Sequence, residues 1–537
     1  MAVAEYEHAV EIDEPPIAFE GAVPLDRIRA ITMRFILAST VIFLVAGALG
    51  AIIRQSQAKV YVIDPTLWYE LMTTHGLGAF VGWAAFAFMG LTWWVLAECG
   101  LPLTKWGARW AEACWWTMVV GVAGVVITTI SLSVGVSWVA LYPLPLAPQR
   151  WWSDAAAAFF AGSVLIAGLS IFFYCFGILA TVTSPALGAP KGTGFFKRMG
   201  MALGIGMLAK SFRTERRVPF PVIPFTVIGI DMIIATTPFA VLLILMIVEA
   251  IFPSVTVDPL LAKTMLWWFG HPVVYLLLFP GVGVFYHLIP RFAGRPLVAG
   301  HVLVVGWLIG VVTNVIIGAH HMYLDFPNSV QQWVNTWSQP LTYAVTIPSA
   351  LSLFSLALTI YRSKFKWNIS SIWIASSLAS WLVAGFQGVL LATISYDVYA
   401  HNTLWVVGHF HNMALLNLGG VIFAGIYAFL PKLTGRQWAS QKLAMSHWAL
   451  TMIGGYGSVV PWMWQGMHGA PRRWAVLPGS EYDMASKWSI PFIILIALGQ
   501  LLFAINIAKT LGVAWLRVAV GERLPRLGAK GEIVARE

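Results

Sequence analysis

The chain has 537 residues, of which 59% are hydrophobic and only 10% are charged. Soluble domains carry about 25% charged residues, so this composition excludes an ordinary soluble protein. The net charge of +10 would suit a nucleic-acid partner, but the basic residues gather in alternate loops, where they act as topology signals, and no nucleic-acid partner is expected.

Apolar runs along the chain predict an all-α membrane protein, a bundle of about 12 transmembrane helices, because each run reaches the roughly 20 residues that cross a bilayer. We expect one transmembrane domain over 31–513, between tails over 1–30 and 514–537. The predicted helices lie near residues 31–54, 74–98, 112–136, 155–182, 223–252, 261–290, 299–323, 338–361, 371–395, 403–430, 442–466 and 487–513.

Lys and Arg are abundant in the second, fourth, sixth, eighth and tenth loops and scarce in the others. The positive-inside rule therefore predicts that both termini lie in the cytoplasm. The longest connection, 183–222, contains the basic segment GFFKRMGMALGIGMLAKSF, which predicts a helix lying on the membrane surface. The acidic N-terminal sequence AEYEHAVEIDEPP predicts no cleaved signal peptide.

Histidines occur in or beside several predicted spans. A single intramembrane histidine is usually a hydrogen-bonded packing residue, but several ionisable groups at depth are costly and indicate function. In the predicted topology these histidines all lie toward the outer half of the membrane, and His75 stands at the start of its helix. Imidazole suits copper, zinc and iron, and the three cysteines show no CxxC spacing that would compete. The residues are His75, His271, His320, His321, His409 and His411.

The spacing of the histidines predicts their directions. His409 and His411 are two residues apart, or about 200° around a helix, so one helix presents them to opposite sides. His320 and His321 point about 100° apart and suit one ion held at a helix end.

The stretch WWFGHPVVYLLLFP places His271 and Tyr275 four residues apart, on one face of a helix that is otherwise compatible with lipid. Pro272 frees a backbone carbonyl near the start of this helix, where a nearby site tolerates it. Imidazoles and a phenol in this combination favour redox chemistry on a small ligand over a structural zinc site.

The motifs GHPVVY, AHH and HNTLWVVGHFH, in this order, resemble subunit I of the haem–copper oxygen reductases, over roughly residues 30–510. Together they are specific, whereas HH or HFH alone is weak. The resemblance implies a terminal respiratory oxidase, a cytochrome c oxidase, in a bacterial or archaeal cytoplasmic membrane. It would reduce O2 to water with electrons from an outer donor and protons from the cytoplasm, and pump further protons outward.

The resemblance also implies the cofactors: a low-spin haem of b or a type, a high-spin haem expected to be of a type, and the copper ion CuB. His75 and His411 would be the axial ligands of the low-spin haem. His409 would be the single protein ligand of the high-spin haem. Three further histidines would hold CuB: His271, His320 and His321.

Four polar residues would lie on the haem-propionate side of the site. Arg472 and Arg473, in APRRW, would pair with the propionates, a task that suits guanidinium. Asp397 and His401 resemble the propionate-side residues near the water exit. Without the family resemblance, the arginine pair would be read as an ordinary solvated pair.

Tyr275 would be joined covalently to His271 and would supply an electron and a proton when the O–O bond breaks. The best-known branch carries a glutamate where this chain has Val273. We find no buried carboxylate elsewhere in the central helices, and this departure, with YPLPL at 142–146, resembles the B-class oxidases. That class uses one proton pathway, which rises from the cytoplasm to the cross-linked tyrosine.

Candidates for this pathway lie inward of Tyr275. The tyrosine usual seven residues further on is Val282 here, so a water or another helix must fill the gap. Serines in membrane helices commonly bond their own backbone, so the serine part of the route has a purely structural alternative. The candidates are Tyr286, eleven residues inward on the same helix face, and three serines at three-residue steps, Ser349, Ser352 and Ser355.

The partners implied are a subunit II that carries the donor copper site, cytochrome c or another small redox protein, O2 and membrane lipids. A quinol oxidase is an open alternative, because the donor docks on another chain. A nitric oxide reductase fits less well, since that group lacks the HPxxY tyrosine. A transporter without haem is the alternative from another class. The sequence leaves open the haem types, the pumping stoichiometry and the accessory subunits.

Overall fold

The computed structural model of the chain describes residues 19–146, 151–298, 300–323 and 328–516, and the short ranges 526–527 and 533–534. These residues form a bundle of long helices and one two-stranded ladder, in which β1 (Arg526–Leu527) pairs antiparallel with β2 (Ile533–Val534). Apart from this ladder, the predicted all-α bundle is confirmed for the described residues.

The first part of the bundle consists of α-helices interrupted by short π-helical or 3-10 segments, which carry the label η. In chain order these are α1 (Leu25–Gln57), α2 (Pro65–Leu77), the π-helix η2 (Gly78–Ala85), α3 (Phe86–Glu98), α4 (Lys105–Val126), the π-helix η3 (Ile127–Ser131), α5 (Asp154–Val182), the 3-10 helix η4 (Pro185–Leu187), α6 (Phe195–Ala202), the 3-10 helices η5 (Ile205–Met207) and η6 (Lys210–Phe212), and α7 (Val222–Ile251).

The second part continues in the same manner. Its elements are α8 (Pro259–Gly270), α9 (Pro272–Ala293), α10 (Gly300–Ile316), the 3-10 helix η7 (Ile317–Met322), α11 (Asn328–Ile360), α12 (Ile369–Ala392), α13 (Ile394–Ala400), α14 (Leu404–His411), the π-helix η8 (Asn412–Gly419), α15 (Gly420–Thr434), α16 (Gln441–Met467), the 3-10 helix η9 (Ser480–Tyr482) and α17 (Asp483–Leu516).

Eleven helical stretches of the described residues are long and apolar enough to cross a membrane. The remaining long helix, α16, has 27 residues and packs along α17, but it is richer in polar and aromatic residues. If α16 is counted with these eleven stretches, the number of long helices agrees with the about 12 that the sequence predicts. Three of these stretches join two α-helices: α2–η2–α3, α8–α9 and α14–η8–α15.

Four helices begin six or more residues earlier than their hydropathy predicts: α1, α2, α4 (Lys105 instead of 112) and α11 (Asn328 instead of 338). α1 begins at Leu25, inside the segment predicted as a tail, and α2 begins at Pro65 instead of near residue 74. The Asp64 side chain accepts a hydrogen bond from the backbone N–H of Thr66 at 2.8 Å and so caps α2, whose first residue is a proline. His75 therefore lies ten residues inside α2, and the prediction that it stands at a helix start is wrong.

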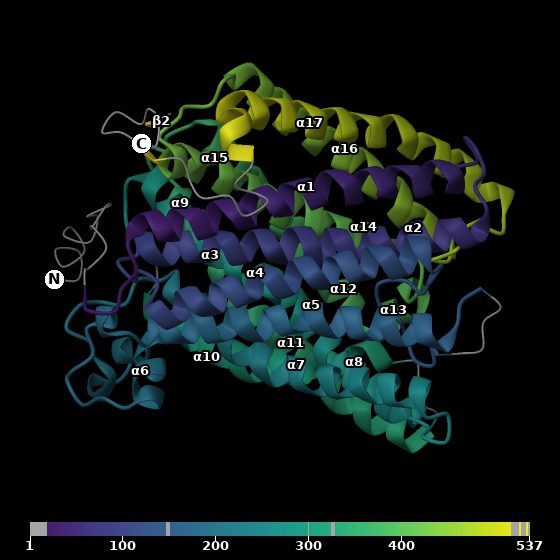
Figure 1. Cartoon of the computed structure of the whole chain (residues 1–537), viewed down its shortest axis with the longest axis horizontal. Helices are drawn as coiled ribbons and strands as arrows, with labels where there is room; N and C mark the ends of the chain where they lie inside the picture. The colour runs from purple at the N-terminus through teal and green to yellow at the C-terminus, as the bar shows by residue number, and fades with distance from the viewer. Residues whose placement is uncertain are drawn as a thin grey trace.

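The long helices lie side by side along the longest axis of the molecule (Figure 1). α6 lies at one end of the bundle, and α2 and α13 lie toward the other. We call these the α6 end and the α13 end. The predicted surface helix in the connection 183–222 is only eight residues long, α6, and is followed by the 3-10 helices η5 and η6.

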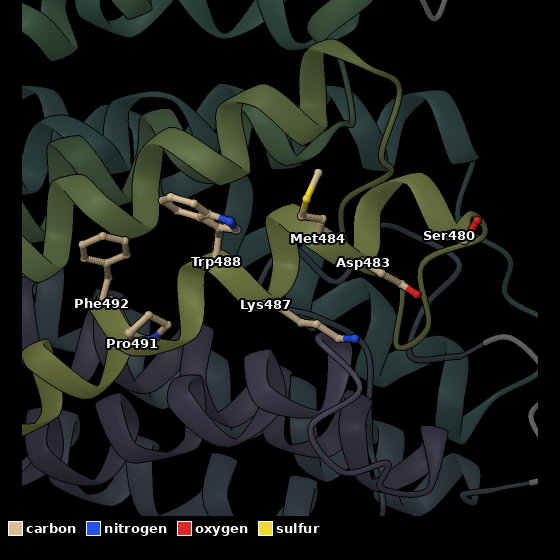
Figure 2. A pocket seen from close by; sticks show the side chains of 7 residues that line it. All are labelled: Ser480, Asp483, Met484, Lys487, Trp488, Pro491 and Phe492. Atoms are coloured by element: carbon tan, nitrogen blue, oxygen red, sulfur yellow. The ribbon is translucent and has the colours of Figure 1, made fainter.

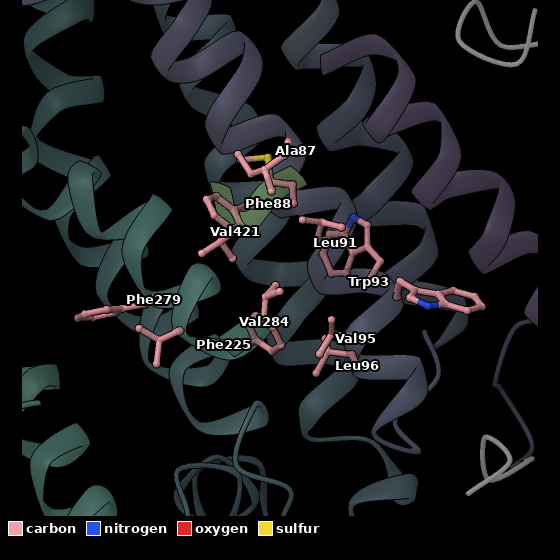
Figure 3. Packing of buried hydrophobic residues seen from close by; sticks show 14 of the residues in the cluster. Ala87, Phe88, Leu91, Trp93, Val95, Leu96, Phe225, Phe279, Val284 and Val421 are labelled. Atoms are coloured by element: carbon pink, nitrogen blue, oxygen red, sulfur yellow. The ribbon is translucent and has the colours of Figure 1, made fainter. Parts of the chain in front are cut away.

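A buried apolar core joins α3, α7, α9 and α15, and Figure 3 shows members from each helix. Phe88 on α3, Phe225 on α7 and Val421 on α15 are fully buried. A Cβ added at Gly283 on α9 would stand 2.5 Å from the Phe225 ring, so the missing side chain lets α7 and α9 approach closely. This contact fixes the register of α7 against α9.

Candidate functional site

The six predicted histidines lie where one kind of helix gives way to another. His75 is three residues before the π-helix η2, and His409 and His411 are in the last turn of α14, directly before the π-helix η8. His271 separates α8 from α9, where Pro272 removes a backbone donor. Such interruptions are frequent at functional sites because they turn side chains out of the regular helical register. The other two lie in the 3-10 helix η7: His320 and His321.

Three of these histidines form a group that suits one metal ion. Potential ligand atoms of His271, His320 and His321 all lie within 4.8 Å of one another. His271 Nδ1 is 3.3 Å from His321 Nε2, and His271 Nε2 is buried with no partner among the described residues. Imidazoles that share one ion bind it at ~2.0 Å, which fits a group of this size. Three imidazoles at this spacing therefore fit copper.

Neighbouring side chains hold the rings of this group. His321 stacks on Trp267 with ring centroids 4.1 Å apart and an interplanar angle of 9°. His320 Nδ1 lies 3.1 Å from the Thr342 hydroxyl on α11. A second sphere of this kind fixes the ring orientation of a metal ligand.

Tyr275 lies on the same face of the chain as His271, one turn further along α9. Their ring centroids are 4.9 Å apart at an interplanar angle of 49°, and Tyr275 is 8% exposed. The predicted neighbourhood of the phenol and the histidine group is therefore present in the structure.

His75 and His411 form a separate pair. Their rings lie 6.2 Å apart between centroids and are within 10° of parallel. Each Nδ1 lies near a backbone carbonyl, Ala46 O at 2.8 Å and Val407 O at 2.9 Å. A carbonyl only accepts, so each Nδ1 donates and each Nε2 keeps its lone pair. Two imidazoles that ligate one metal from opposite sides have centroids ~6 Å apart, since each bond is ~2.0 Å long.

His409 points to the other side of α14, as its spacing from His411 predicts. His411 faces α2 and α16, with its ring centroid 4.9 Å from that of Trp462. His409 faces α12, where its Cε1 is the atom nearest to a Cβ built on Gly388, at 3.6 Å. Its buried Nδ1 has no partner among the described residues. One short helix therefore presents imidazoles to two separate spaces.

An apolar cavity of about 250 Å³ connects the surroundings of these groups. Its lining includes Ala46 and Thr74 beside His75, and Gly270 and Val273 on either side of His271. It also includes Val45, which is 57% exposed on the outer surface of α1.

Arg472 and Arg473 follow α16 on the α13 side of the histidines. The Arg472 guanidinium donates to Asn402 Oδ1 at 2.7 and 3.1 Å, and Arg473 Nη2 is buried with no partner among the described residues. Burial lowers the pKa of Arg472 to about 9 and that of Arg473 to about 10. Both remain cationic at neutral pH, and such a pair suits an anionic ligand.

Asp397 and His401 pair with each other across one turn of α13, with His401 Nδ1 3.0 Å from Asp397 Oδ2. Asp397 is 5% exposed. The two residues therefore bind each other, at the same end of the bundle as the arginines.

The predicted proton-path residues are only partly brought together. The Tyr286 hydroxyl is 2.6 Å from Ser352 Oγ and accepts from Trp307 Nε1 at 3.1 Å. Ser355 instead donates to the backbone carbonyl of Val298. Ser349 is half-buried on the same helix. The structure thus joins Tyr286 to one serine and not to a continuous stripe.

The statement that the central helices hold no buried carboxylate is wrong. Asp231, in the middle of α7, has an exposed fraction of 0%. Its Oδ2 accepts from Asn314 Nδ2 at 2.9 Å. The signal in the sequence was a single acidic residue within the apolar run VIPFTVIGIDMIIATTPF, which hydropathy averaging conceals.

Two other buried histidines have partners of their own, away from the site. His287 Nε2 is 2.6 Å from Glu98 Oε2, and Lys432 also donates to Glu98, at 2.8 Å. His447 lies 3.1 Å from the Tyr427 hydroxyl and 3.2 Å from Gln500 Oε1. These contacts explain both imidazoles without a metal.

A second pocket lies on the first turns of α17 and is open to the outside (Figure 2). It contains Trp488 and Lys487 but no histidine, and it is not part of the site.

Comparison with known proteins relates this arrangement to one family. The model described as "Cytochrome C and Quinol oxidase polypeptide I" matches residues 30–502. A "Cytochrome c oxidase subunit 1" of Synechocystis is 24% identical over 494 residues, 89% of this chain and 83% of that protein. A "Cytochrome c oxidase polypeptide 1" of Halobacterium salinarum is 29% identical over 254 residues, 47% of this chain but only 42% of that protein.

Two further similarities extend over most of the chain. A "Heme-copper oxidase subunit I+III" of Aeropyrum pernix is 27% identical over 433 residues, 79% of this chain and 50% of that protein. A solved heme-copper terminal oxidase dimer has a TM-score of 0.73 at 19% identity, and the match covers 93% of this chain and 85% of that chain. At 19% identity the structural match shows the fold alone.

Proposed function

Since this chain belongs to the family of haem–copper oxidase subunit I, we propose that it is the catalytic subunit of a terminal oxidase that reduces O2 to water. The observation that carries the proposal is the gathering of the six histidines into a trio, a pair and a single ring, with Tyr275 beside the trio.

Each histidine group has its own cofactor in this proposal. His75 and His411 hold the low-spin haem, His409 holds the high-spin haem, and His271, with its two partners in η7, holds CuB. The haems and copper, when bound, supply the O2-binding position and the electrons. The support is that Nε2 of His75 and of His411 is left with its lone pair, and that the trio lies within 4.8 Å.

Tyr275 holds a proton at its hydroxyl next to the copper-ligating group. The close approach of its ring to His271, 4.9 Å between centroids, supports a covalent link between the two side chains. In this role Tyr275 gives up one proton and one electron in each turnover. The proton is then replaced from the α6 end, and the electron comes from the outer donor.

Arg472 and Arg473 hold the propionates of the haems. The Arg472 guanidinium donates to a neutral acceptor, Asn402 Oδ1. The buried Arg473 Nη2 is a donor that can bind a further acceptor. Propionate carboxylates would supply the missing negative charge and raise both arginine pKa values toward their ordinary range. Asp397 and His401 complete the polar layer on this side.

The α6 end faces the cytoplasm in this proposal, and protons enter from there. The Tyr286–Ser352 contact supports a single route on that side of Tyr275, as in the B-class, and Val273 leaves no glutamate for a second route at its position. The α13 end then faces outward, and pumped protons leave there.

The apolar cavity suits the delivery of O2, because O2 is apolar and partitions into the bilayer. The cavity extends from Val45, on the outer surface of α1, to Gly270 and Val273 beside the trio.

We infer that the donor is cytochrome c or another small redox protein acting through a subunit II with a copper site. Relatives described as cytochrome c oxidases support this choice, and a quinol donor is the competing reading because the family description names both. The purified complex should oxidise reduced cytochrome c and consume O2. Oxidation of quinol alone would contradict the donor assignment.

A reduced-minus-oxidised spectrum with a metal assay tests the function itself. We expect signals of one low-spin and one high-spin haem and one copper per chain, in addition to any copper in subunit II. A purified complex without haem bands would favour the transporter reading and end the oxidase proposal.

A further inference from the structure

Asp231 on α7 is an isolated carboxyl group in the interior of the bundle. It is fully buried, and so is Asn314 on α10, its one hydrogen-bond partner. Asp231 Oδ1 and Asn314 Oδ1 both lack a partner among the described residues. The hydrogen-bonded pair therefore leaves two buried oxygens to be satisfied, a polar position that suits a water molecule.

The surroundings of Asp231 favour a neutral carboxylic acid. Burying an ionised carboxylate without a cation is far more costly than burying the protonated form. No Lys or Arg pairs with Asp231 in the part of the chain that the structure describes, and Cys175 on α5 is a titratable side chain on which the charge of Asp231 would act. Since Oδ2 accepts from the Asn314 amide, the proton belongs on Oδ1 and is available to a water.

The register of α7 against α9 gives the depth of this group. Gly283 lies against Phe225, and the two helices run in opposite directions. At ~1.5 Å per residue, Asp231 lies ~9 Å from that contact toward the α13 end and Tyr275 lies ~12 Å in the same direction. Tyr286 lies on the other side of the contact, toward the α6 end. Asp231 therefore stands between the two tyrosines in depth.

The register of α10 agrees. Trp307 donates to the Tyr286 hydroxyl, and Asn314 follows seven residues later, which is within about 20° of two full turns. The face of α10 that touches Tyr286 therefore also presents Asn314 to Asp231, ~10 Å nearer the α13 end.

Tyr286 and Tyr275 are themselves ~16 Å apart along α9, too far for direct proton transfer. Val282, which lies between them, carries no polar group. Where α9 lacks a polar residue between the two tyrosines, α7 therefore carries a buried acid at an intermediate depth.

We propose that Asp231 is the proton-relay residue between Tyr286 and Tyr275, an inference that rests on the proposed oxidase function. In one step the Asp231 Oδ1–H bond breaks, and its proton passes through water to the deprotonated Tyr275 oxygen, forming the phenol O–H bond. In the next step a proton from the Tyr286 side neutralises the Asp231 carboxylate. No electron moves in either step.

Asp231→Asn in the whole purified complex tests the relay, since the amide has the same size and hydrogen-bonds to Asn314 but carries no exchangeable acid proton. We expect turnover to fall by about 100-fold, the lower end of what a positioned proton donor contributes. Both haem signals should persist, and Asp231→Glu should restore most of the rate. The control Glu112→Gln removes a carboxylate of a part-buried pair with Arg34 that is not in the proposed route, and it should keep the rate.

Infrared difference spectra of the reduced and oxidised wild-type complex give a second readout that needs no variant. A protonated Asp231 should contribute a carbonyl band that shifts in D2O, disappears in Asp231→Asn and moves in Asn314→Ala. It should persist in the Glu112 control.

Wild-type turnover in Asp231→Asn would overturn the relay. A carbonyl band that changes neither with the redox state nor in D2O would also overturn it, because a purely structural acid would show such a band. These outcomes are separate from failure of the proposed function. A complex without haem bands ends the oxidase proposal, whereas a haem-loaded, O2-reducing complex without the Asp231 band ends only the relay.

Discussion

At His411 the protein fixes the ring from two sides. The Nδ1 donates to the Val407 carbonyl one turn back, and Trp462 packs against the ring at a centroid distance of 4.9 Å. His409, two residues earlier, shares neither contact and faces α12. The two imidazoles therefore depend on different neighbours, although they share one helix.

Loss of the His411 imidazole should consequently affect one cofactor. We expect His411→Ala to remove the low-spin haem signal and to leave the high-spin signal, as measured in the reduced-minus-oxidised spectrum of the complex. His447→Gln, which changes a buried histidine with its own partners, is the matched control and should retain both signals. Loss of both haems in His411→Ala would contradict the assignment.

Tyr275 differs from His411 in its proposed role. Tyr275 takes part in the reaction, whereas His411 binds a cofactor. Tyr275→Phe keeps the ring that packs between His271 and Phe279 but removes the hydroxyl. O2 consumption should fall by more than about 100-fold, while the spectrum keeps both haems. Tyr174→Phe, at a buried tyrosine bonded to Thr92, should keep the activity. An active Tyr275→Phe enzyme would exclude the redox role.

The opposite directions of His409 and His411 could be foreseen from spacing, because angles along one helix follow from sequence separation alone. The trio and the His75–His411 pair join different helices, and only the family resemblance predicted them. The cofactor assignments of those histidines stay proposals. The proposed role of Asp231 could not be foreseen in the same way, since it depends on the hydrogen bond to Asn314, which is 83 residues away on another helix. A single acid in a long apolar run leaves α7 apolar enough to cross a membrane.

Among the helices, α7 and α9 approach each other closely at a core glycine, Gly283. Gly283→Ala would bring a methyl group to 2.5 Å from Phe225. We expect this overpacking to cost about 1–3 kcal/mol and to speed thermal loss of the haem signal. Gly168→Ala on α5 is the control, since nothing lies within 4 Å of the added Cβ. Equal thermal stability of the two variants would argue against a tight α7–α9 register.

Hydropathy predicted the existence of the helices well and their ends less well. The Asp64 cap extends α2 by nine residues beyond the apolar run, because a cap acts through one hydrogen bond and not through hydrophobicity. π-helical segments such as η2 and η8 were missed for a similar reason, since they follow from tertiary packing.

Across the whole molecule, polarity is divided between two ends. The α6 end holds the Glu98–His287–Lys432 cluster and the start of the proposed proton route. The α13 end holds Asp397 and the arginine pair, and α2, α8 and α14, which carry or adjoin the histidines, lie toward it (Figure 1).

This division predicts the orientation in the membrane. Phe196 on α6 is 78% exposed and Met484 at the start of α17 is 71% exposed, so a cysteine at either position should react with a membrane-impermeant maleimide. Phe196→Cys should react only in inside-out vesicles and Met484→Cys only in right-side-out vesicles. The parent chain, with Cys99 half-buried and the other two cysteines buried, gives the background. The reverse pattern would invert the proposed topology.

The π-helix η8 has a consequence for how this chain can change its length. A π-helix holds one residue more than an α-helix with the same hydrogen-bonded ends, so deleting one residue in Asn412–Gly419 would restore α-helical geometry. It would also turn His409 and His411 by about 100° relative to α15, away from their neighbours. The residue count of this span is therefore set by the direction of the two histidines relative to α15, and a thinner or thicker bilayer must be matched elsewhere along the helix.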